Sequence, residues 1–163
     1  MATPDILKRL ALPKRKYFVY NVKFVCGLQK NKFETDCEAI LSRGIYSTEI
    51  NILNYGIKEA TVVKLFTPVV VQNKAIAREP KTQGPVNFER VVLKPLHATM
   101  DDCCKILEML KKEKADEQLK IGFVEIISPV ALEVYAVYTV TDLEQVNPSV
   151  NVVQVEARSL SIG

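Results

Sequence analysis

IGFVEIISPVALEVYAVYTVT, residues 121–141, is the stretch that decides the fold of this chain. It predicts two strands that are joined as a hairpin across Ser128-Pro129. In the second strand, alternate residues form one continuously apolar face: Leu132, Val134, Ala136, Tyr138 and Val140. Because the side chains of a strand alternate between its two faces, other strands must cover this face. We therefore expect the hairpin to be the centre of a β core.

Five further stretches have the alternation and the aromatic or β-branched content of strands, namely residues 16–26, 45–54, 59–71, 88–93 and 150–157. Within the third of them, Pro68 is expected to mark a bulge, an edge or a break, since proline cannot donate to a ladder. The pattern has no repeated strand–helix alternation. It predicts a mainly β fold, an antiparallel β-sandwich of the jelly-roll or Ig-like kind.

A single helix is predicted at about residues 99–115, TMDDCCKILEMLKKEKA, in a connection between strands. Thr99 is the expected N-cap, and Asp101 and Asp102 suit the positive end of the helix dipole. The apolar stripe contains Cys103, Ile106, Leu107 and Leu110. This stripe turns Cys103 toward the core and leaves Cys104 outside.

The chain of 163 residues predicts a basic N-terminal arm, residues 1–15, and one β-sandwich domain, residues 16–163. With 48% hydrophobic and 25% charged residues, the composition is that of a folded globular protein. No apolar run approaches the ~20 residues that a membrane-spanning helix needs. The N-terminal residues lack the apolar segment of a secretory signal, so we expect a cytoplasmic protein or one exported without a recognisable signal peptide.

The arm combines positive charge with a short apolar stripe. Residues 1–32 hold eight of the 22 Lys and Arg but only one of the 19 Asp and Glu, so the rest of the chain carries a net charge of −4. The arm is expected to dock on the acidic body of a neighbouring copy, and the alternatives are a solvated tail or folding back on its own subunit. Nucleic acid is not an expected partner, since no reading helix follows. The assembly residues are Ile6, Leu7, Lys8, Arg9, Leu10, Leu12, Lys14, Arg15 and Lys16.

The middle of the chain has a familiar order of parts. STEINILNYGIKEATVV precedes a strand that ends in LKPLHATMDD, and IGFVEIISPVALEVYAVYTVTD follows. Over about a hundred residues, this order and the Ile52-Leu53-Asn54 turn resemble the small bacterial β-sandwich of the sensory rhodopsin transducer type. The basic arm and the long helix are additions to that pattern. The resemblance implies an oligomeric binding module without catalytic activity.

The cysteines do not have the spacing of a zinc site, so no metal and no cofactor are predicted. Cys26, Cys37 and Cys104 are candidates for a disulfide or a cross-link between copies, and Cys26 and Cys37 are close enough in sequence to pair with each other. Alternatively, all four cysteines are reduced. His97 with Cys103 or Cys104 would be the only candidate nucleophile pair, but no third orienting residue is indicated.

These observations leave two main hypotheses for function. The first is a non-enzymatic, self-associating structural or scaffold protein that forms oligomers or filaments through its arm and its sheet edges. The alternative is a ligand- or protein-binding module that uses the exposed loop 72–87, with Arg78, Lys81 and Arg90 as its candidate contacts. No catalytic residue is predicted.

Overall fold

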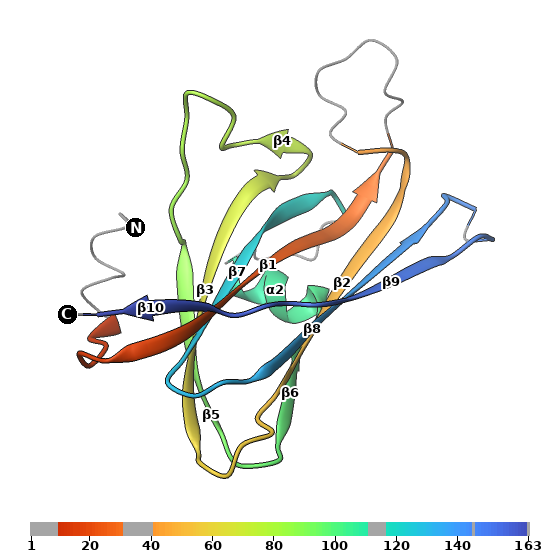
Figure 1. The fold of residues 1–163 in the computed structure, drawn as a ribbon. Coiled ribbons are helices and arrows are strands. Elements are labelled where there is room, and N and C mark those ends of the chain that lie inside the picture. Colours follow the sequence, from red (N-terminus) through yellow and green to blue (C-terminus); the bar gives the residue numbers. More distant parts are fainter. Residues whose placement is uncertain (1–9, 31–40, 111–116, 145, 163) are drawn as a thin grey trace.

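The fold is mainly β, as predicted, with a ten-stranded antiparallel sheet and the short helix α2 (Cys103–Met109) (Figure 1). The computed structural model describes residues 10–30, 41–110, 117–144 and 146–162. One half of the sheet contains β3 (Ala60–Val71), β4 (Lys74–Ala75), β5 (Asn87–Leu93), β7 (Lys120–Ser128) and β10 (Arg158–Ser161). The other half contains β2 (Gly44–Leu53), β6 (Ala98–Asp101), β8 (Glu133–Thr141) and β9 (Ser149–Gln154).

Strand β1 (Lys16–Gln29) belongs to both halves. Most of its length pairs with β7, whereas its last residues, from Gly27 onward, pair with β2. Gly27 has a φ of 107°, and a Cβ atom there would lie 2.5 Å from the carbonyl oxygen of Gln118. Only glycine tolerates both the positive φ and this close approach of another backbone. The change of partner along β1 therefore depends on a residue that has no side chain.

The main apolar core takes side chains from both halves of the sheet and from α2. One half supplies Tyr20, Val22, Phe24, Val62, Phe66, Val124 and Ile126, and the other supplies Ile50, Ile52, Val134 and Ala136. The helix adds Ile106 and Met109. Full burial of one such side chain is worth roughly 1.5–3 kcal/mol. The apolar face predicted for residues 132–140 is core at Leu132, Val134 and Ala136, while Tyr138 and Val140 are half-buried.

The predicted hairpin across Ser128-Pro129 is wrong, because β7 and β8 do not pair with each other. Strand β7 pairs with β1 and β3, and β8 pairs with β2 and β9, so residues 129–132 carry the chain from one half of the sheet to the other. Both strands have an apolar face, and each covers the shared core from its own half. Alternation alone does not distinguish this crossing from a hairpin.

Tyr20 on β1 holds the crossing. Its buried hydroxyl donates a hydrogen bond to the carbonyl oxygen of Leu132 at 2.9 Å and accepts one from the N–H of the same residue at 2.7 Å. Burial raises the pKa of the Tyr20 hydroxyl, although the hydrogen bond to Leu132 opposes the shift. Both backbone groups of Leu132 are thus satisfied inside the protein, where no solvent would replace them.

The helix is shorter than predicted. The residues before it form strand β6, which pairs with β2, so Thr99 is not the N-cap. Asp102 caps the helix instead, and its side chain accepts a hydrogen bond from the N–H of Lys105 at 2.9 Å. The predicted last turn, residues 111–115, lies outside the described residues. Asp101 belongs to β6 and has a different partner, which explains why two successive aspartates stand here.

A buried charge cluster connects β3, β5, β6 and α2. The Nζ atom of Lys64, a residue only 1% exposed, lies 2.7 Å from a carboxylate oxygen of Asp101 and 2.8 Å from one of Glu89. The other oxygen of Glu89 lies 2.8 Å from the Nζ atom of Lys105. Burial alone would raise the pKa of Glu89, but the hydrogen bonds and charges of Lys105 and Lys64 outweigh it and hold that pKa below its ordinary value of 4.5. The cluster fixes the helix to the sheet.

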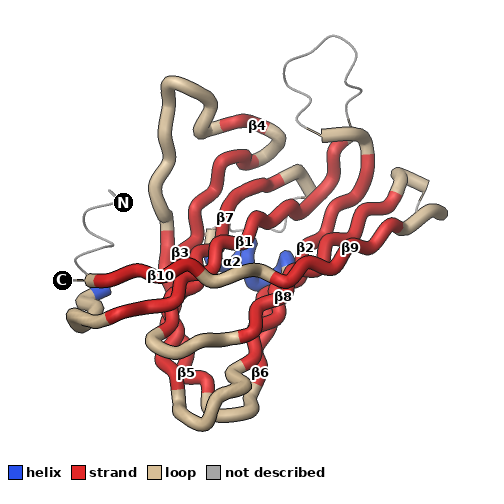
Figure 2. The backbone as a smooth tube through the Cα atoms, viewed as in Figure 1, coloured by secondary structure: helices blue, strands red, loops and turns tan. Residues whose placement is uncertain are grey.

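Most of the predicted strands are confirmed, although short ones were missed. Residues 16–26, 45–54, 59–71 and 88–93 correspond to β1, β2, β3 and β5. The register between β3 and β7 shifts between Pro68 and Val70, so the ladder is irregular at the proline where a bulge, an edge or a break was expected. The predicted C-terminal tail contains β10, which pairs with the start of β1, and a short loop links it to β9 (Figure 2). Its sequence RSLS has too little apolar alternation to predict a strand.

Replacing Tyr20 by Phe should lower the free energy of unfolding by about 1–3 kcal/mol, because the backbone groups of Leu132 would stay buried without a partner. Urea unfolding at neutral pH measures the loss. Tyr46→Phe is the matched control, since the Tyr46 hydroxyl donates to the carbonyl oxygen of Ser42 in an exposed position. Equal losses in the two variants would show that the crossing does not depend on Tyr20.

The charge cluster should make stability depend on pH through Glu89. Because its folded-state pKa lies below 4.5, the carboxylate stabilises the fold fully above that pH, and the contribution is lost as pH falls through the folded-state value. Glu89→Gln should therefore be less stable at pH 7 and lose less stability between pH 5 and pH 3. Thermal melts across this range test it, with Glu59→Gln as the control because that residue is exposed and is not part of the cluster. Identical pH profiles for wild type and Glu89→Gln would contradict the assignment.

Candidate functional site

The cysteines form a disulfide that the sequence did not predict. Cys26 on β1 is joined to Cys103, the first residue of α2, across 77 positions of sequence, with a Cα–Cα distance of 5.7 Å. The expected pairing of Cys26 with Cys37 is therefore replaced, and Cys37 lies outside the described residues. Cys104 is a free, exposed thiol. The prediction that Cys103 faces inward and Cys104 outward is confirmed.

The other residues considered for chemistry have structural partners. Cys103 is held in the disulfide, and Nδ1 of the exposed His97 lies 2.9 Å from the carbonyl oxygen of Pro95. Asp101 pairs with Lys64. Within the described ranges, no group of three or more His, Cys, Asp or Glu side chains could hold a metal ion. In the same part of the chain, no helix has the length and apolar character of a membrane span.

The second part of the N-terminal arm folds back on its own chain. Leu10 is buried with Tyr17, and Leu12 packs against the same small cluster. Arg90 on β5 donates a hydrogen bond to the carbonyl oxygen of Leu10. The guanidinium of Arg15 lies 5.4 Å from the centre of the Tyr17 ring. Of the expected assembly residues, Leu10, Leu12 and Arg15 thus contact their own subunit, while Ile6, Leu7, Lys8 and Arg9 lie outside the described residues.

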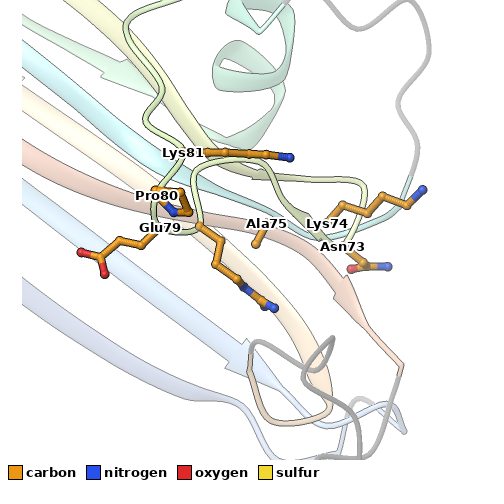
Figure 3. A pocket seen from close by; sticks show the side chains of 7 residues that line it. Asn73, Lys74, Ala75, Glu79, Pro80 and Lys81 are labelled. Carbon is orange, nitrogen blue, oxygen red and sulfur yellow. The ribbon is translucent and has the colours of Figure 1, made fainter.

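The predicted binding loop contains a hollow of about 380 Å³, which we call the basic hollow (Figure 3). Its charged and polar lining consists of Asn73, Lys74, Arg78, Glu79 and Lys81, and Ala75 and Pro80 complete it. Two of the three predicted contact residues, Arg78 and Lys81, therefore come together. The third, Arg90, does not line the hollow, because its strand places it beside Leu10. Sequence reasoning missed Lys74, which β4 brings to the same hollow.

Strand β9 lies at the edge of the sheet, and sequence reasoning did not single it out as a site. It pairs with β8 on one side and with no described strand on the other. The N–H of Val155 donates to the carbonyl oxygen of Val134 at 2.8 Å. This hydrogen bond fixes which residues of β9 direct their peptide groups toward β8, because such residues alternate along the strand. The peptide groups of Val150, Val152 and Gln154 consequently point away from β8. They form a free hydrogen-bonding edge.

The face of β9 that points away from the core is apolar. Val150 is 63% exposed and Val152 is 59% exposed, and they lie beside Thr139 and Val137 of β8. All six residues of β9 are exposed, and its sequence SVNVVQ contains neither charge nor proline. Natural sheet edges usually carry lysine, proline or a bulge that prevents pairing with another chain. This edge lacks those protections.

No family model matches this chain, and no curated protein matches it. Among solved structures, it is similar to a Thermotoga maritima protein described as "Crystal Structure of Thermotoga maritima 1070". The identity is 14%, the TM-score is 0.45, and the alignment covers 87% of this chain and 92% of that chain. A likeness at this level bears on neither the site nor the function. The resemblance to the sensory rhodopsin transducer type stays a prediction.

Removing the disulfide should destabilise the fold by about 2–5 kcal/mol, because the cross-link closes a long loop of the unfolded chain. Cys26→Ala/Cys103→Ala should show this loss in thermal or urea unfolding without any reductant. The Cys104→Ala variant is the control and should unfold like the wild type. If dithiothreitol leaves the wild-type melting temperature unchanged, the two cysteines are not joined in solution.

Proposed function

We propose that this protein is a non-enzymatic structural or scaffold protein that associates with copies of itself through the free edge of β9. The observation that carries the proposal is an uncharged, fully exposed edge strand whose outer peptide groups have no partner among the described residues. We further propose that the two halves of the sheet form a β-sandwich of the jelly-roll or Ig-like kind. Support for that architecture comes from the single core to which both halves contribute.

A second copy is the natural partner for this edge. Two β9 strands related by a twofold axis would pair in antiparallel fashion, and each would offer the same donors and acceptors to the other. Val150 and Val152 of both copies would then form one continuous apolar surface, with Val137 beside it. No charge within β9 would be desolvated in the process, because the strand contains none. Such a contact is isologous and gives dimers, onto which further edges or the arm could add.

In this proposal, fewer residues of the arm contact a neighbouring copy than the sequence predicted. Leu10 and Leu12 already pack on their own subunit, which leaves residues 1–9 as the part of the arm for exchange between copies. The predicted resemblance to an oligomeric bacterial β-sandwich supports self-association in general. The disulfide supports an oxidising setting, and so favours export over the cytoplasm among the two locations expected.

A second candidate function is ligand binding by the loop 72–87. The specific observation in its favour is the basic hollow, in which side chains from β4 and the following loop surround a space of about 380 Å³. Binding pockets for small molecules commonly have volumes of roughly 300–1,000 Å³. The hollow and the β9 edge are different surfaces, so the two functions do not exclude each other.

Val152→Lys should convert the assembly into monomers. Across a twofold β9 pair, the two new charges would lie close together on the apolar face, which should weaken association by about tenfold or more. Light scattering coupled to size-exclusion chromatography, over a range of protein concentrations, measures the mass. Val92→Lys is a matched control, because Val92 has the same 59% exposure but lies on β5.

Two results would contradict this use of the edge. One is a wild-type protein that stays monomeric at every concentration, and the other is a Val152→Lys variant that assembles like the wild type. Deletion of residues 1–9 separates the arm from the edge: if only the deletion yields monomers, association depends on the arm and not on β9.

A further inference from the structure

We infer that the basic hollow binds a small organic anion with a phosphate-like dianionic group. The inference rests on the second candidate function and adds the chemical class of the ligand. Three cations, Lys74, Arg78 and Lys81, line the hollow together with one carboxylate, that of Glu79. Within the described residues, neither Lys74 nor Lys81 forms an ion pair, whereas the clustered lysines elsewhere, Lys64 and Lys105, do. The hollow therefore carries a local excess of positive charge.

The backbone around the hollow is fixed before any ligand binds. Gln72 and Asn73 have φ values of 52° and 61° and form a tight turn between β3 and β4. Asn73 is tied twice to Leu119: its N–H donates to the carbonyl oxygen at 3.1 Å, and its Oδ1 accepts from the N–H at 3.0 Å. Ile76 donates to the carbonyl oxygen of Val69. The wall that carries Lys74 is thus held by β3 and by Leu119, the residue before β7.

The opposite wall is a turn in which the N–H of Lys81 donates to the carbonyl oxygen of Arg78 at 2.9 Å. This hydrogen bond keeps the two cations on one turn. Positive groups whose backbone is already ordered bind an anion with a smaller loss of conformational entropy than groups on a disordered tail. The two lysines suit a phosphate group, because each supplies a compact positive charge with three donors.

The size and the remaining lining indicate an organic ligand rather than a bare ion. A space of about 380 Å³ exceeds what one phosphate group fills, and Ala75 and Pro80 give it an apolar part. The carbon portion of a phosphorylated small molecule would lie against these two residues. Figure 3 shows the carboxylate of Glu79 pointing away from Lys74 and Asn73.

The test uses glucose 6-phosphate as the probe, with uncharged glucose as its matched control, in NMR titrations of the full chain. Resonances of residues 73–81 should shift with glucose 6-phosphate and stay unchanged with glucose. Lys74→Ala/Lys81→Ala should weaken binding by at least about tenfold, since two of the cations that line the hollow are removed. Glu79→Gln should strengthen binding, because it removes the carboxylate that lines the hollow among the described residues.

The controls are Lys58→Ala and Lys94→Ala, two exposed lysines in other loops, which should bind glucose 6-phosphate like the wild type. If these two substitutions weaken binding as much as the double variant does, binding of the probe depends on the overall charge of the protein and not on the hollow, and the inference fails. If residues 73–81 respond to glucose and not to its phosphate, the hollow is a binding site but the anion class is wrong. If neither probe shifts the resonances of these residues, the inference is overturned. If a screen of uncharged and cationic fragments also leaves these resonances unshifted, the second candidate function is overturned too.

Discussion

The hydroxyl group of Tyr20 fixes the point at which the chain crosses from one half of the sheet to the other. It satisfies both backbone groups of Leu132 at the point where the chain crosses from β7 to β8. Leu132 is buried, so an unpaired backbone group there would cost about 1–3 kcal/mol. Val134 and Ala136 follow at once and fill the core from the second half. Strand β8 continues from this crossing, pairs with β2 along its whole length and pairs with β9 on its other side.

The helix is attached by other means, because seven residues are too few for a stable helix in water. Its N-terminal residue is covalently joined to β1 through the disulfide. Two residues later, Lys105 joins the charge cluster that is centred on Lys64. Ile106 and Met109 of the helix are buried in the main core, and Cys103 and Leu107 pack against it. Covalent, ionic and apolar contacts together hold this short helix on the sheet.

Sequence alternation predicted which stretches are strands but not which strands pair. Residues 121–141 show the limit: the apolar faces were correctly placed at Val134 and Ala136, yet pairing depends on where Tyr20 lies, which is a tertiary property. The disulfide is a similar case, since 77 positions separate Cys26 from Cys103. Arg90 was grouped with Arg78 and Lys81 because the three are close in sequence. Arg90 lies on β5, where it contacts Leu10, and so it does not line the hollow. The uncharged composition of β9 is visible in the sequence, whereas its place at an edge is not.

Strand β1 pairs with strands of both halves of the sheet, and this affects how the chain folds during its synthesis. Phe18 pairs with Ser128, and Lys16 pairs with Ser161, so most of β1 is synthesised long before the strands with which it pairs. At ordinary rates of synthesis, roughly 5–20 s pass before β7 follows it. During that time Phe24 and its neighbours have no core to enter, and pairings so distant in sequence also form slowly. A strand that unites the finished fold is thus left without most of its partners while the chain is being made.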